Sequence, residues 1–315
     1  MRLGSFLIVF VVSCASAASP LVEPIKPLPF QGGIDAARAA IGQRLFDDKR
    51  LSANDTVACS SCHKLDQGGV DGFAHSTGFS GKPTSVNTPT IFNAVYNFRQ
   101  FWNGRADSLE SQIDFVIANP VEMGSRWTDI VAKLSQDSNY RRSFAGPYAD
   151  GITAANIRNA LAIFERTLTT PNARFDRYLR GDSGAISAAE KAGYSKFKQF
   201  GCIACHQGVN VGGNMFQKFG VMGDYFANRG KPTEADLGRF LVTGEDSDRY
   251  VFKVPSLRNV TRTAPYFHDG TAATLDAAVD VMFRYQLGRV ASKEDKAAII
   301  QFLGTLTDET RPMTP

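Results

Sequence analysis

Two C-x-x-C-H pentapeptides are the residues of this chain whose types and spacing most directly imply chemistry. They read CSSCH at residues 59–63 and CIACH at residues 202–206. In this pattern the two thiols bond the vinyl groups of a porphyrin, and the histidine that follows becomes an axial ligand of the iron. The sequence therefore predicts two covalently bound c-type haems. Their predicted attachment and ligand residues are Cys59, Cys62, His63, Cys202, Cys205 and His206.

The first residues of the chain predict export. One arginine, a short apolar stretch and an A-x-A-like site indicate a signal peptide over residues 1–17, which is too short to span a membrane. Cys14, the only cysteine outside the two motifs, also fits a lipoprotein cleavage site that would leave a lipid anchor. Both alternatives place the mature protein in the periplasm. Its other four cysteines then serve cofactor attachment rather than a disulfide framework.

Length and composition narrow the class of protein further. A chain of 315 residues is long enough for two domains, and 43% hydrophobic with 21% charged residues is typical of a soluble folded protein. The net charge of +4, without a basic run, argues against a nucleic-acid partner. The proline-punctuated segment 18–34 predicts an extended N-terminal arm.

Hydrophobic periodicity predicts a mainly α fold, because strand-like alternation is sparse. The predicted helices are one beginning near Asp35, then Ser108–Ala118, Trp127–Leu134, Thr153–Leu168, one beginning at the Ser187/Glu190 capping box, Thr274–Met282 and Ser292–Leu306. The stretch 172–184 reads as the passage between halves. We therefore expect two cytochrome c-like helical domains, at residues 35–178 and 179–315, with the last residues packing back on the first domain.

An internal repeat relates the two halves. PTIFN at 89–93, FWNG at 101–104 and Leu109 match PSLRN at 255–259, FHDG at 267–270 and Leu275, always with an offset of 166 residues. The haem motifs are offset by 143 residues, from 59 to 202. Each half is thus predicted to contain a helix, a haem motif, a loop and a helix that returns over the other face of the haem.

The repeat also predicts that the two irons differ in their sixth ligand. In the second half, the returning helix presents Met282, whose thioether can complete a His/Met pair. The alternative is that Met282 only fills the core. The repeat aligns Met282 with Val116, which cannot bind iron. The first haem is therefore expected to have an open face, where a peroxide could bind.

Two side chains near that open face could assist with protons. Gln112 lies on the predicted helix, and Glu122 follows it in the turn NPVEM. Cleaving a peroxide O–O bond requires that a proton move from one oxygen to the other, and a carboxylate is a suitable carrier. Glu122 could equally cap a helix or lie on the surface.

Six segments in order resemble the bacterial di-haem cytochrome c peroxidases, within the group that includes MauG-type enzymes. They are CSSCH, VNTPTIFNAVYNFRQFWNGRA, NPVEMG, GCIACHQGVNVGG, VPSLRNVTRTAPYFHDG and the Met282 segment, between about residues 33 and 306. The resemblance implies that the chain reduces hydrogen peroxide to water with electrons from a small cytochrome c or cupredoxin. It also implies that His63 serves the peroxidatic haem, and that His206 and Met282 bind the haem that collects electrons.

The same resemblance assigns further roles. Trp102 would be an electron-transfer bridge between the haems, and Glu122 with Gln112 would line the peroxide pocket. A calcium ion would be bound by Asn87 and by the backbone carbonyls of Thr263 and Pro265. MauG-type enzymes carry tyrosine where this chain has Met282, which disfavours radical chemistry on a partner protein.

One departure from the family concerns a loop histidine that covers the peroxidatic haem in the oxidised enzyme. Aligning GGVDGFAHSTGFSG with that loop places Phe79 at its position. His75 lies four residues earlier, so either His75 covers the iron or the site is permanently open, and the open site is our prediction. A di-haem electron carrier and a MauG-like oxidase remain the alternative functions. The oligomeric state is left open, with a homodimer as one alternative.

Overall fold

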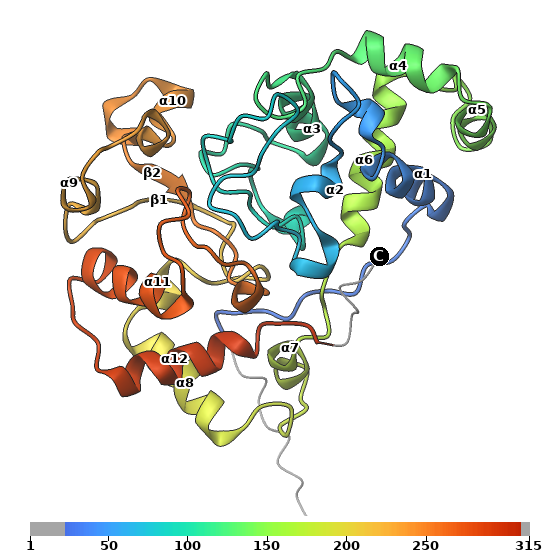
Figure 1. Cartoon of the computed structure of the whole chain (residues 1–315). Helices are drawn as coiled ribbons and strands as arrows, with labels where there is room; N and C mark the ends of the chain where they lie inside the picture. Colours follow the sequence, from blue (N-terminus) through green and yellow to red (C-terminus); the bar gives the residue numbers. More distant parts are fainter. Residues whose placement is uncertain (1–22, 310–315) are drawn as a thin grey trace, which may run out of the picture.

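A computed structural model describes residues 23–309, and its fold is mainly helical (Figure 1). The predicted signal peptide at residues 1–17 and Cys14 lie outside the described residues. The helices are α1 Ala36–Phe46, α2 Cys59–Cys62, α3 Leu109–Ala118, α4 Trp127–Ser135, α5 Ser138–Ala145, α6 Ala154–Thr167, α7 Arg174–Leu179, α8 Ala188–Gln199, α9 Tyr225–Arg229, α10 Phe240–Thr243, α11 Leu275–Val281 and α12 Lys293–Gly304. A π-helical turn, Met282–Gln286, extends α11.

The first half is built on a core between α1 and α6, with α3, α4 and α5 packed around it. Helices α1 and α6 approach each other closely at Gly42. A Cβ atom there would lie 2.0 Å from the Ala160 carbonyl oxygen and 2.7 Å from the Phe164 Cβ. Glycine is therefore required at this crossing of α1 and α6. Ser108 caps α3 by accepting a hydrogen bond from the backbone N–H of Ser111.

The second half repeats this arrangement between α8 and α12. A Cβ atom on Gly193 would lie 2.0 Å from the Ala298 carbonyl oxygen and 3.1 Å from the Phe302 Cβ. Ser187 and Glu190 form the predicted capping box at the start of α8. In each half, a glycine of one helix therefore packs against a phenylalanine of the other: Gly42 of α1 against Phe164 of α6, and Gly193 of α8 against Phe302 of α12.

The repeat predicted from sequence is present in the backbone. Asn93 and Asn259 both have positive φ, 61° and 58°, and each begins a 3₁₀ turn. Phe101 and Phe267 also share a positive φ, at 67° and 71°. Four residues adopting the sparsely populated left-handed conformation at one offset are not a coincidence of local sequence. The two halves thus have the same loop architecture.

Loops that follow the second haem motif carry an antiparallel pair of strands, β1 Phe216–Lys218 and β2 Val251–Lys253. A small aromatic cluster around Tyr225, Phe226 and Phe252 lies beside it. The sequence analysis predicted neither this pair nor α5, α9 and α10. Three-residue strands are too short to show an alternation pattern.

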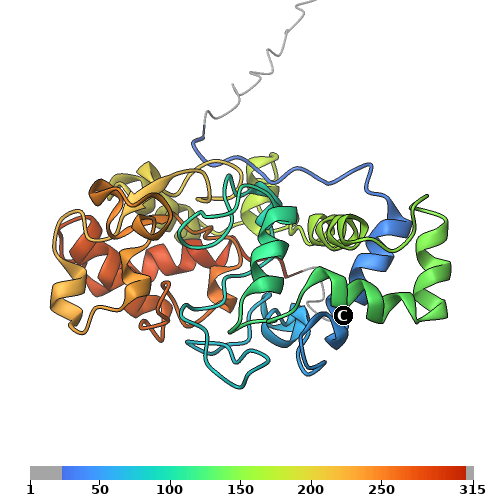
Figure 2. The same cartoon turned by 90° about the horizontal axis from the view of Figure 1, so that it is seen from above.

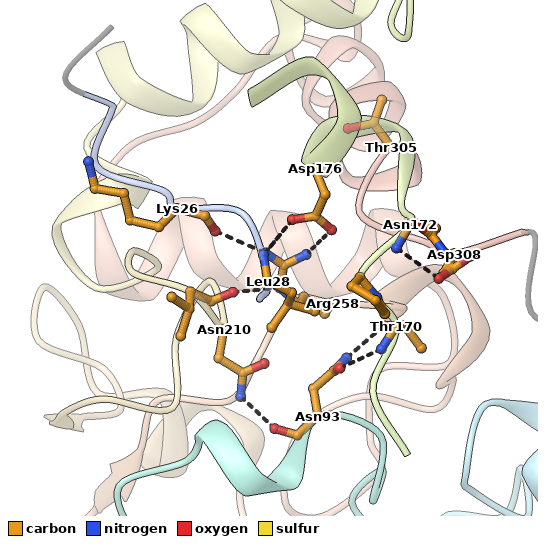
Figure 3. A network of polar contacts seen from close by, with 12 residues as sticks. Lys26, Leu28, Asn93, Thr170, Asn172, Asp176, Asn210, Arg258, Thr305 and Asp308 are labelled. Carbon is orange, nitrogen blue, oxygen red and sulfur yellow. Dashed lines mark hydrogen bonds and ion pairs between the residues drawn. The ribbon is translucent and has the colours of Figure 1, made fainter. Parts of the chain in front are cut away.

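A polar network joins the N-terminal arm, the second half and the passage between the halves (Figure 3). The Arg258 guanidinium and the Asp176 carboxylate, both fully buried, form a bidentate ion pair with distances of 2.7 and 2.9 Å. Leu28 N–H donates to Asp176 Oδ1 at 2.9 Å, and Arg258 Nη2 donates to the Lys26 carbonyl at 3.2 Å. The described part of the predicted arm is thus extended and bound to the second half.

The passage between halves is not a simple linker. It contains α7, whose Phe175 is fully buried and contacts the rings of Tyr194 and Phe302 at 4.8 and 5.0 Å. Thr305 accepts a hydrogen bond from Phe175 N–H, so the end of the chain returns to this segment. Figure 2 shows the two halves on either side of it. Within residues 23–309, none of the helices has the length and apolar character needed to cross a bilayer.

Candidate functional site

Two cavities open beside the two C-x-x-C-H motifs. The first has a volume of about 760 Å³ and is lined by Cys59, Cys62 and His63. The second has a volume of about 410 Å³. Its lining includes Cys202, Cys205, His206 and Met282. The six motif residues that the sequence singled out therefore face cavities large enough for a bulky planar cofactor.

Both motif histidines are oriented by a backbone carbonyl. His63 Nδ1 lies 3.1 Å from the Gly69 carbonyl oxygen, and His206 Nδ1 lies 3.4 Å from that of Val211. A hydrogen bond at Nδ1 leaves Nε2 free to bind a metal. Burial lowers the pKa of His63, and it lowers that of His206 to about 4. Both imidazoles are therefore neutral at pH 7, as a ligand must be.

The four motif cysteines are free thiols rather than disulfides. Burial raises the pKa of Cys59 to about 12 and that of Cys202 to about 11. Reactive cysteines show the opposite shift, because the thiolate is the nucleophile. The arrangement of thiols, histidine and cavity in each half fits covalent haem attachment and does not fit thiol catalysis.

The two residues that the repeat aligns, Met282 and Val116, line different cavities. Met282 lines the second cavity together with His206, and Val116 lines the first together with His63. Met282 begins the π-helical turn, whereas α3 continues as a regular α-helix through Val116. Such π turns often occur at functional sites, because they shift a side chain off the regular helical register. Sequence periodicity could not reveal this turn.

Glu122 and Gln112 both line the first cavity. The Glu122 carboxylate accepts a hydrogen bond from Asn119 Nδ2 at 2.8 Å. Burial raises the pKa of Glu122 above its ordinary value, while Arg105 and Asn119 act in the opposite direction. A carboxylate with a raised pKa holds a proton more readily than an exposed glutamate, so it is better suited to accept a proton and return it.

Trp102 lines both cavities. Its indole Nε1–H donates to the Asn87 carbonyl oxygen at 2.9 Å, which fixes the ring. His268, the repeat counterpart of Trp102, is buried and donates a hydrogen bond from Nε2 to the Asp236 carboxylate at 2.7 Å. A charged network surrounds Asp236, since Arg229 forms ion pairs with both Asp236 and Asp269.

The loop that follows the first haem motif is packed against the turn carrying Glu122. Phe79 N–H donates to the Glu122 carbonyl oxygen at 2.9 Å. A Cβ atom on Gly124 would lie 2.1 Å from the Phe79 ring, and one on Gly78 would lie 1.7 Å from the Val121 carbonyl oxygen. His75 is exposed, and it is absent from the residues lining the first cavity among those the structure describes.

The three residues considered for calcium all line the second cavity: Asn87, Thr263 and Pro265. Asn87 is buried and its Nδ2 donates to the Phe73 carbonyl oxygen at 2.9 Å. Carbonyl and amide oxygens are suitable calcium ligands.

The sequence analysis missed three charged residues at these cavities. Arg105 lines the first cavity and stacks on Phe101, 3.4 Å from the ring centroid. Glu165 also lines it, and burial raises the pKa of its carboxyl to about 8. Lys253 lines the second. Only Lys253 had a visible signal, a lone lysine inside the apolar run YVFKVP.

Comparisons with known proteins agree with this site. Residues 36–184 match the family model for di-haem cytochrome c peroxidase. Cytochrome c551 peroxidase of Nitrosomonas europaea is 42% identical over 91% of this chain and 85% of its own length. Cytochrome c peroxidase Ccp of Escherichia coli is 45% identical over 92% of this chain, which spans only 62% of that relative.

A solved structure, described as a MauG-like protein associated with microbial copper homeostasis, has a TM-score of 0.81 and 29% identity. The match covers 93% of this chain and 96% of that protein. The motifs, the two cavities and these relatives together place the chain in a family: it belongs to the di-haem cytochrome c peroxidases.

Proposed function

We propose that this protein reduces hydrogen peroxide to water, with electrons from a small reduced cytochrome c or cupredoxin. The observation that carries the proposal is the contrast between the cavities, one lined by Met282 and the other by Val116, Gln112 and Glu122. Two haem c groups, held through residues 59–63 and 202–206, would carry the donor's electrons and provide the iron at which peroxide binds. Two cytochrome c-like domains, divided near residue 178, would each hold one of them.

The chain's own residues perform the proton chemistry in this proposal. Glu122 accepts a proton from the oxygen of hydrogen peroxide and returns it to the departing oxygen. Asn119 holds the carboxylate in place through its 2.8 Å hydrogen bond. Gln112 lines the same cavity and orients the peroxide by hydrogen bonding.

Trp102 supports electron passage from the second cavity to the first. It lines both cavities, and its indole is held by the Asn87 carbonyl oxygen. An aromatic ring fixed between two redox groups shortens the distance that an electron must cross. Calcium bound by Asn87, Thr263 and Pro265 would support this wall of the second cavity.

We further propose that the first site is open in the fully oxidised protein. Phe79 occupies the position of the family's covering histidine and packs on Gly124, while His75 is exposed. The site then needs no reductive activation. Export to the periplasm, with or without lipid attachment at Cys14, is part of the same proposal.

One experiment tests the activity. Peroxide consumption is measured with reduced cytochrome c, with and without pre-reduction of the enzyme, and with and without a calcium chelator. Turnover without pre-reduction is expected. A pure electron carrier would show no turnover in any condition, and a MauG-like oxidase would consume peroxide only with a protein substrate.

A further inference from the structure

Lys253, the last residue of β2, is a buried cation that has no counter-charge among residues 23–309. Its side chain is 7% exposed. Burial alone lowers the pKa of its ammonium to about 8. In the described part of the chain its bonds are those of the backbone, and its Nζ makes no ion pair and no hydrogen bond. Burying an ammonium costs free energy unless an anion lies beside it. We therefore expect a bound group to supply the anion that the described residues lack.

The protein part of the second cavity supplies no anion. Of the described residues that line it, none is aspartate or glutamate. Lys218 also lines this cavity but is exposed, and His268 is already bonded to Asp236. A negative group that meets Lys253 must therefore enter with whatever occupies the cavity. Haem carries two propionate carboxylates, which are suitable partners for an ammonium.

The position of Lys253 follows from the repeat. Lys253 N–H donates to the Trp102 carbonyl oxygen at 2.8 Å, and Asn87 N–H donates to that of His268 at 2.7 Å. Residues 87 and 253, like 102 and 268, are separated by 166 positions. These two bonds are therefore equivalent, and Lys253 is the counterpart of Asn87. Where one half places an amide, the other places a positive charge beside Trp102.

We propose that Lys253 pairs with a propionate of the haem attached at Cys202 and Cys205, holding that edge of the haem beside Trp102. The inference rests on the second haem of the proposed function and not on peroxide turnover. Lys253 lines the second cavity and is absent from the described lining of the first, so the pairing concerns one haem only.

The pairing has an electrostatic consequence. An unpaired propionate stabilises the more positive, oxidised iron, and a neighbouring ammonium cancels that effect. Lys253 therefore raises the reduction potential of the second haem. It contributes, with Met282, to making that haem the acceptor of electrons from the donor protein.

The test uses the full-length protein with both haems attached. Spectroelectrochemical titration gives the midpoint potential of each haem in wild type, Lys253→Met, Lys253→Arg and Lys293→Gln. We expect Lys253→Met to lower the equilibrium constant for reduction of the second haem about tenfold, which is 59 mV for a one-electron couple. Lys253→Arg keeps the charge, and Lys293→Gln removes an exposed charge from α12 that lines neither cavity in the described chain, so both remain within twofold of wild type.

An unchanged second-haem potential in Lys253→Met overturns the proposal, as does an equal shift of both haems. If Lys253→Met does not accumulate, Lys253→Gln, which keeps a polar side chain, decides by the same criteria. Peroxide turnover is measured in parallel. If the proposed peroxidase function is wrong, the wild-type protein shows no peroxide turnover. The potentials of wild type and Lys253→Met still test the pairing in that case, so the two failures are distinguishable.

Discussion

Trp102 and His268 are counterparts in the internal repeat, and they meet edge to face between the two halves. Their ring centroids lie 6.4 Å apart and their planes differ by 70°. The flanking hydrogen bonds, from Lys253 to Trp102 and from Asn87 to His268, are equivalent in the repeat. The halves therefore pack about an approximate two-fold axis at this pair. The pair is not symmetric: Trp102 lines both cavities, whereas His268 lines only the second among the described residues.

Replacement of Trp102 tests its role between the cavities. Trp102→Phe keeps an aromatic ring but removes the Nε1–H that donates to the Asn87 carbonyl oxygen. We expect normal haem content and slower transfer of electrons from the second haem to the first, measured by stopped-flow absorbance. Trp127→Phe is the matched control, since Trp127 bonds Asp114 and lines neither cavity within the described chain. Equal rates in the two variants would contradict the role of Trp102.

Glu122 is expected to control turnover and its pH dependence. Glu122→Gln should reduce kcat/KM for peroxide about 10²- to 10⁴-fold with unchanged haem spectra. In wild type the ionised carboxylate is the active base, so activity rises with pH through the pKa of Glu122. Because burial raises that pKa, the acid limb lies above the ordinary glutamate value. Near-normal turnover in Glu122→Gln would remove this residue from the mechanism.

Asn119→Ala should move the acid limb without abolishing activity. The Asn119 hydrogen bond lowers the pKa of Glu122 by stabilising the ionised form. Its loss raises the pKa, so the acid limb shifts to higher pH in a profile of kcat/KM. A shift to lower pH, or a uniform loss of activity at every pH, would be the contrary result.

The loop at residues 71–81 is expected to leave the first site open. His75→Ala should not alter the absorption spectrum of the oxidised protein, because the His75 side chain is exposed. Phe79→His should convert the first haem from high-spin to low-spin and make turnover depend on pre-reduction. Electron paramagnetic resonance of the oxidised proteins measures both outcomes. A spectrum altered by His75→Ala would show that this histidine covers the site.

The buried pair of Arg258 and Asp176 is expected to stabilise the junction of the halves. Arg258→Met leaves the Asp176 carboxylate buried and unpaired, which should cost about 3–5 kcal/mol in the free energy of unfolding. Combining it with Asp176→Leu should recover most of that loss, because no unpaired charge remains. Denaturant unfolding followed by fluorescence compares the single and the double variant with wild type. A double variant as unstable as the single would contradict this account.

The main helices could be predicted from sequence because their signals are local. Ser108, Thr153 and Ser187 each accept a capping hydrogen bond at the predicted helix start. The contrast of Met282 with Val116 followed from one offset. The helix α7 could not be predicted, because its six residues are held by contacts of Phe175 with distant rings.

The sequence by itself determined which residues are candidates for the chemistry of each half: the two C-x-x-C-H motifs, Met282 in the second half, and Val116 at the equivalent position of the first. These properties depend on residue type and spacing along the chain. Only the tertiary structure decided how the halves meet. It placed Trp102 against both cavities, exposed His75, and buried the Lys253 side chain with no ion pair among the residues that the structure describes. Such relations join residues far apart in the chain, so burial and pairing, rather than local pattern, define them.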